Sequence, residues 1–64
     1  MVIINGEKTN ASGVTVSDYL KSAGYSPDRV AVEKNGEIVP KCKYSETVFA
    51  DDDTVEIVSF VGGG

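Results

Sequence analysis

The stretch TVEIVSFV, residues 54–61, is the longest apolar-rich run of the chain and decides how the rest must be arranged. Its β-branched and aromatic residues predict a β-strand that is buried largely on one face and partly covered on the other. Because this strand comes last, it is sheltered only if it pairs with the first strand of the chain. We therefore expect a mixed sheet that this strand closes.

Two Asn-Gly dipeptides predict two hairpins, whose strands can pair with the last strand on either side. The apolar residues 2–4 end at Asn5-Gly6, and a polar return strand follows from residue 7 to about residue 11. Residues 30–32 and 38–39 flank Asn35-Gly36 in the same way, and Pro40 ends the second hairpin. Asn-Gly accepts the positive φ angles of a tight type I′ turn, so both dipeptides favour hairpins.

Between the hairpins the apolar period changes to that of a helix of about ten residues. The apolar stripe consists of Val16, Tyr19, Leu20 and Ala23. Thr15 is a suitable N-cap, Gly24 suits the left-handed residue that ends a helix, and Pro27 prevents its resumption. We expect Leu20 to fill the core, and residues 41–47 to form a polar connection with at most one helical turn.

The resulting order ββαβββ predicts an α+β protein of the β-grasp (ubiquitin-like) class, with a mixed sheet of four to five strands packed on one helix. We expect one domain over residues 1–61 and a flexible tail of three glycines, residues 62–64.

Composition excludes several classes of function. The chain has 64 residues, a formal net charge of -4 and no His. A chain this short rarely walls off a deep pocket, and without His it lacks the usual general base and the usual zinc ligand. The negative charge argues against nucleic-acid binding. A single cysteine forms no internal disulfide, and no stretch has the pattern of a signal peptide or membrane span, so we expect a cytoplasmic protein without membrane contact.

The glycine tail is the first candidate site. Gly62, Gly63 and Gly64 follow the last strand directly, and extended they span roughly 10 Å. Without side chains they fit a narrow channel and deliver the carboxylate of Gly64. A frayed terminus or a spacer explains the same residues equally well.

A second candidate is a docking surface beside the tail. If the alternate residues of the last strand face the helix, Val58 and Phe60 point to the opposite face, where with Val61 they offer an apolar patch and Lys41 a charged rim. The alternative is that Phe60 folds over the sheet edge and completes the core.

Three segments, VAVEKNGEIVP (residues 30–40), INGE (4–7) and VEIVSFVGGG (55–64), resemble the ThiS family, the sulfur carriers of thiamine biosynthesis. The resemblance covers essentially the whole chain. It implies that a partner (E1-like) enzyme uses ATP to adenylate Gly64 and that a sulfur donor, such as a cysteine desulfurase, converts the adenylate to a thiocarboxylate. Thiazole synthase receives the sulfur. The chain is then a protein substrate, with no catalytic residue, bound cofactor or metal of its own.

Three other functions stay open at this stage. The chain could be a sulfur carrier of the same chemistry that supplies sulfur to molybdopterin, a tungsten cofactor or another sulfur metabolite. A ubiquitin-like modifier joins its carboxyl end to lysine. An interaction module has an inert tail.

The chain departs from the family in two places. Asp52 stands where the family usually has Gly, so we expect it in the left-handed conformation within a solvated acidic turn, not a metal site. Lys41 stands where the family commonly has Arg. We interpret Cys42 as an incidental loop thiol, and Glu33 and Lys34 as solvated positions.

Overall fold

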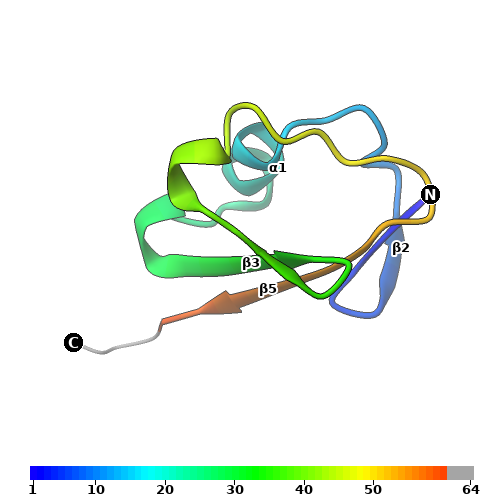
Figure 1. The fold of residues 1–64 in the computed structure, drawn as a ribbon. Helices are drawn as coiled ribbons and strands as arrows, with labels where there is room; N and C mark the ends of the chain where they lie inside the picture. The colour runs from blue at the N-terminus through cyan, green and yellow to red at the C-terminus, as the bar shows by residue number, and fades with distance from the viewer. Residues whose placement is uncertain (61–64) are drawn as a thin grey trace.

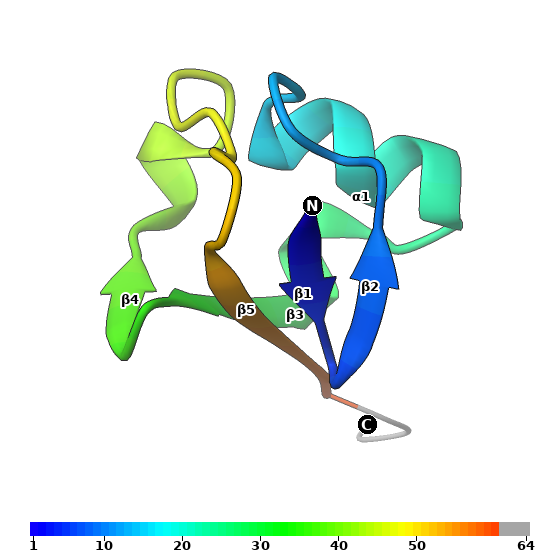
Figure 2. The same ribbon diagram turned by 90° about the vertical axis from the view of Figure 1, so that its right-hand side faces the viewer.

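The strand β5 (Thr54–Ser59) lies at the centre of a five-stranded mixed sheet. The computed structural model describes residues 1–60 (Figure 1). Within them the strand order is β2-β1-β5-β3-β4, with β5 parallel to β1 and antiparallel to β3 (Figure 2). The other elements are β1 (Val2–Ile4), β2 (Glu7–Thr9), α1 (Val16–Ala23), the 3-10 helix η1 (Pro27–Arg29), β3 (Val30–Lys34), β4 (Glu37–Val39) and the 3-10 helix η2 (Lys41–Lys43). The predicted order ββαβββ and the β-grasp architecture are confirmed.

Both hairpins turn at the predicted dipeptides. Asn5 and Gly6 have φ angles of 52° and 83°, and Asn35 and Gly36 have 53° and 85°. Positive φ at both central residues is the signature of a type I′ turn, whose twist matches that of the flanking strands. The return strand β2 ends at Thr9 rather than near residue 11, because its partner β1 begins at Val2, which pairs with Thr9.

The helix α1 has the predicted caps and is shorter than predicted, with eight residues. The hydroxyl oxygen of Thr15 accepts a hydrogen bond from the Asp18 amide at 3.1 Å. Gly24 is left-handed, with φ 85°, and its amide bonds back to the last turn. Ala23, the last residue of the helix, is exposed, so its predicted place in the apolar stripe over the sheet is wrong, whereas Val16 and Leu20 of that stripe are buried.

The core lies between α1 and one face of the sheet. Leu20 and Val16 from the helix meet Val55 and Ile57 from β5, and all four are buried. Figures 1 and 2 show the helix on this face only, and within residues 1–60 no helix or strand covers the opposite face. The sheet therefore presents an open outer face.

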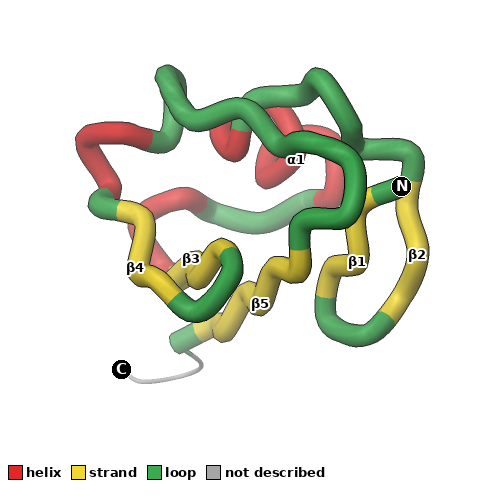
Figure 3. The backbone as a smooth tube through the Cα atoms, turned by 45° about the vertical axis from the view of Figure 1, so that its right-hand side comes forward, coloured by secondary structure: helices red, strands yellow, loops and turns green. Residues whose placement is uncertain are grey.

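The connection from η2 to β5 also contributes to the core, which its polar sequence does not predict. Tyr44 and Phe49 are buried, and Phe49 is the largest of the fully buried side chains. The segment crosses beside the start of α1 (Figure 3), where Tyr44 and Thr47 accept the amide hydrogens of Ser17 and Val16 at 2.9 Å. The connection thus satisfies two of the free N–H groups of the first helical turn, and the Thr15 hydroxyl satisfies a third.

Within the described residues, no helix is long and apolar enough to cross a bilayer. The predicted domain boundary after residue 61 and the glycine tail lie outside those residues.

Replacement of Leu20 by Ala tests the core. The side chain is fully buried, so Leu20→Ala should lower the free energy of unfolding by about 2 to 5 kcal/mol through lost burial and the cavity left behind. That loss approaches the whole stability of so small a domain. Urea denaturation measures it, with Lys21→Ala on the exposed side of the helix as the control. A loss below about 1 kcal/mol would show that the site repacks.

Candidate functional site

The end of β5 that leads to the glycine tail is the candidate site. Ser59 pairs with Val30 at the start of β3, and the Phe60 amide donates a 2.7 Å hydrogen bond to the Arg29 carbonyl oxygen. The N-terminus lies at the other end of β5, where Ile3 pairs with Thr54. The chain therefore leaves the sheet from its central strand, at the end remote from the N-terminus (Figure 1).

Asn5, just after the end of β1, forms hydrogen bonds with β5 through its backbone and its side chain. Its amide donates to the Val55 carbonyl oxygen at 2.9 Å. Its side chain both accepts from and donates to Ile57, two residues further along β5. The Ile57 amide donates to Asn5 Oδ1 at 2.8 Å, and Asn5 Nδ2 donates to the Ile57 carbonyl oxygen at 3.2 Å. A side-chain amide thus continues the ladder after β1 has turned away.

Asn35 does the same from the β3 side. Its amide donates to the Thr54 carbonyl oxygen at 2.7 Å, and its Oδ1 accepts the Thr54 amide at 2.9 Å. Its Nδ2 donates to Asp53 Oδ1 at 3.0 Å. Each turn Asn therefore shapes its own hairpin and also fixes the central strand.

Asp53 is the buried member of the acidic turn. Its side chain is paired rather than solvated: Oδ2 accepts the Ala50 amide at 2.8 Å, and Lys34 Nζ lies 3.7 Å away. Only 8% of Asp53 is exposed. The Ala50 amide lowers the pKa of this carboxyl group most, Asn35 and Lys34 lower it further, and burial opposes them. The prediction of a fully solvated turn is wrong for Asp53, and that of a solvated Lys34 is wrong as well.

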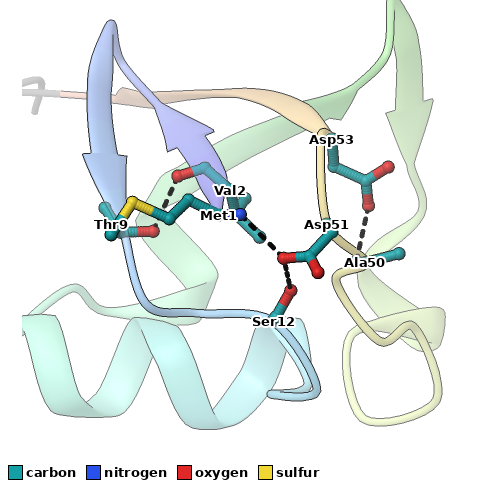
Figure 4. Close-up of polar contacts among 7 residues, drawn as sticks. All are labelled: Met1, Val2, Thr9, Ser12, Ala50, Asp51 and Asp53. Carbon is teal, nitrogen blue, oxygen red and sulfur yellow. Dashed lines mark hydrogen bonds and ion pairs between the residues drawn. The ribbon is translucent and has the colours of Figure 1, made fainter.

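The other two residues of the turn, Asp51 and Asp52, hold the N-terminus near the start of β5. Figure 4 shows the contacts of Asp51 with Met1 and Ser12. Asp51 Oδ1 accepts hydrogen bonds from the N-terminal ammonium group of Met1 at 2.7 Å and from the Ser12 hydroxyl at 2.6 Å. These two hydrogen bonds lower the pKa of the Asp51 carboxyl group. Asp52 has φ 73°, which confirms the predicted left-handed conformation, and its amide donates to the Met1 carbonyl oxygen.

The outer face of β5 carries the apolar residues predicted there. Val58 and Phe60 are each 57% exposed, whereas Val55 and Ile57 are buried. Phe60 therefore does not complete the core. Of the other predicted docking residues, Lys41 donates from Nζ to the Asp28 carbonyl oxygen at 3.2 Å. This bond places it beside η1, whose last residue, Arg29, binds Phe60.

The predicted docking residue Val61 and the glycines Gly62, Gly63 and Gly64 lie outside the described residues. Residues 1–60 form no pocket and no group of three side chains able to hold a metal ion. Cys42 is exposed.

Comparison with known proteins decides the family. The sequence pattern of the ThiS family matches residues 2–64. The sulfur carrier protein ThiS of Bacillus subtilis is 41% identical over 66 residues, which cover 100% of both chains. The crystal structure of a thiamine biosynthesis protein (ThiS) from Geobacter metallireducens has a TM-score of 0.79 at 31% sequence identity, and the match covers 98% of this chain and 97% of that one. The chain belongs to the ThiS family. The resemblance seen in its motifs is confirmed.

Two further relatives of this ThiS-family chain are much longer. A thiazole synthase of Paramagnetospirillum magneticum is 47% identical over 64 residues, and one of Magnetococcus marinus is 42% identical over 62 residues. The matched segments are 20% and 19% of those proteins, so the chain spans about a fifth of their length. The relative from Bacillus subtilis is a sulfur carrier protein, and the one from Geobacter metallireducens is a thiamine biosynthesis protein.

The side-chain bonds of the two turn Asn residues and of Asp53 are the part of the site that sequence reasoning missed. Asn-Gly predicts a turn whatever the Asn side chain does, so only the register between each turn and β5 could reveal the bonds.

Acid titration tests the role of Asp53. Because its pKa is lower in the folded chain, the carboxylate stabilises the fold above its unfolded pKa, and this contribution is lost as the pH falls through the folded value. Asp53→Asn keeps only one acceptor oxygen, so it should lose about 1 to 3 kcal/mol near pH 7. The difference from the unsubstituted chain should shrink steadily below about pH 4.

Unfolding free energies from pH 7 to pH 2 measure this difference. Asp52→Asn is the matched control, because the Asp52 carboxylate makes no hydrogen bond to residues 1–60. A pH-independent difference between the Asp53 variant and the unsubstituted chain would contradict this account.

Proposed function

We propose that this ThiS-family chain carries sulfur on the carboxyl group of Gly64 for thiazole formation in thiamine biosynthesis. The supporting observation is that the family match runs through the last glycine. The strand that precedes the glycines, β5, lies at the centre of the sheet and is hydrogen-bonded on both sides. Gly62 and Gly63 give the carboxyl group its reach, since residues without Cβ fit a channel that excludes side chains.

The chemistry requires activation by a partner enzyme. An α-carboxylate is ionised at neutral pH, and its carbon resists attack by an anionic sulfur nucleophile. A carboxylate oxygen of Gly64 attacks the α-phosphorus of ATP, and pyrophosphate leaves. The terminal persulfide sulfur of a sulfur donor, such as a cysteine desulfurase, then attacks the acyl carbon, and AMP leaves with one carboxyl oxygen. A thiol reduces the resulting acyl disulfide: the thiocarboxylate is released, and the thiol and the donor cysteine form a disulfide. The ATP and the donor belong to the partners, and the carrier holds no cofactor.

Docking of those partners is assigned to the open face of the sheet. Val58 and Phe60 form an exposed apolar pair next to the tail, with Val61 following and Lys41 at the rim. Such a patch is typical of a protein interaction site. Thiazole synthase is the proposed acceptor, because two relatives that bear that name contain a segment similar to this chain.

Mass spectrometry of one peptide tests the function. Digestion after Lys and Arg releases residues 44–64 intact, because no basic residue follows Lys43. After incubation with ATP, a sulfur source and the activating enzyme, this peptide should gain the mass difference between sulfur and oxygen. Oxidation adds nearly the same mass, but the peptide contains neither Met nor Cys.

A chain that lacks Gly63 and Gly64 is the control. It should gain no sulfur and should melt at nearly the same temperature, because a terminal tail makes few contacts. Branched conjugates to lysine would instead indicate a ubiquitin-like modifier. An unaltered peptide from the full chain would contradict the proposal.

A further inference from the structure

The outer face of the sheet places two carboxylates directly opposite each other. Glu33 on β3 and Glu56 on β5 are cross-strand partners, and both are exposed. Neither forms an ion pair with another residue of the described chain, and Lys34, the nearest cation along β3, pairs with Asp53. Like charges in directly opposed positions destabilise a sheet. The free protein thus gains nothing from this arrangement.

Apolar side chains lie on two sides of these carboxylates. Ile38 on β4 is the partner of Glu33 and is 71% exposed. Val58 lies two residues beyond Glu56 on the same strand, opposite Ala31, and is 57% exposed. Glu33 lies between Ile38 and Glu56 in one cross-strand row, and Ala31 with Val58 forms the next row on this face. A protein surface that spans Ile38 and Val58 therefore lies over or directly beside both carboxylates.

Covering the two carboxylates with a partner surface removes their charges from water, which costs free energy. Removing a charge from water is costly unless a charge of opposite sign takes the place of the water, and two adjacent like charges raise that cost. Arginine suits such a site, because its planar guanidinium group donates to two carboxylates at once and is less strongly hydrated than an ammonium group.

We propose that the activating enzyme docks on this face with an arginine placed between Glu33 and Glu56 and with apolar side chains over Ile38 and Val58. The inference rests on the proposed function and adds the charge of the partner surface. The carboxylate pair acts as a specificity element: it admits an apolar surface that carries a cation and rejects one that does not.

Neutralising the pair tests the proposal. Glu33→Gln and Glu56→Gln together preserve shape and remove both charges. The dissociation constant for the activating enzyme, measured by calorimetry in about 50 mM salt, should rise at least about 10-fold. The difference should narrow in about 500 mM salt, where charge interactions are screened. The charge-matched control, Glu7→Gln with Glu46→Gln, changes two exposed residues off this face and should bind within about 2-fold of the unsubstituted chain.

Thermal melting separates binding from folding. The Glu33/Glu56 variant should melt at the same temperature as the unsubstituted chain or slightly higher, because a repulsion is removed. Weak binding together with a clear fall in melting temperature would overturn the proposal, since the carboxylates would then support the fold. Equal affinity of the two double variants in low salt would also overturn it.

Failure of the docking inference can be distinguished from failure of the proposed function. If the unsubstituted chain binds the enzyme and gains sulfur while the Glu33/Glu56 variant does so equally well, only the docking inference fails. If the unsubstituted chain neither binds nor gains sulfur, both fail.

Discussion

The structure depends on satisfying the backbone of one central strand. β5 comes last in the sequence and lies between β1 and β3, so its hydrogen-bonding groups must find partners on both sides. The two hairpins are too short to pair along its whole length, and the turn residues Asn5 and Asn35 continue the ladder with their side-chain amides. Buried Asp53 then fixes Asn35 and the connection before the strand. A change at either turn therefore affects the strand that leads to the tail.

This arrangement fixes the strand that precedes the proposed reactive end. The described residues form no pocket and no group of three side chains able to hold a metal ion. The core supports one sheet face, and the other face stays open beside the strand end. Apolar and acidic side chains on that open face give a partner both area and charge to recognise.

Most of the fold follows from local signals. The Asn-Gly turns, the Thr15 and Gly24 caps and the alternation in β5 each have a local cause, so the sequence predicts them. Burial of Tyr44 and pairing of Lys34 with Asp53 depend on segments that meet only in the folded chain, and a polar sequence around them hides both. The glycine tail is chemically undistinguished by itself, and the proposal for its function rests on the family pattern that extends through it.

The central claim is that the carboxyl group of Gly64 is the reacting group. The most direct measurement is carrier-dependent exchange of labelled pyrophosphate into ATP by the activating enzyme, which reports reversible adenylation without a sulfur donor. A chain that ends in the free acid should support exchange, and one that ends in the Gly64 amide should not, although the two differ in a single functional group. Equal exchange with both chains would contradict the account.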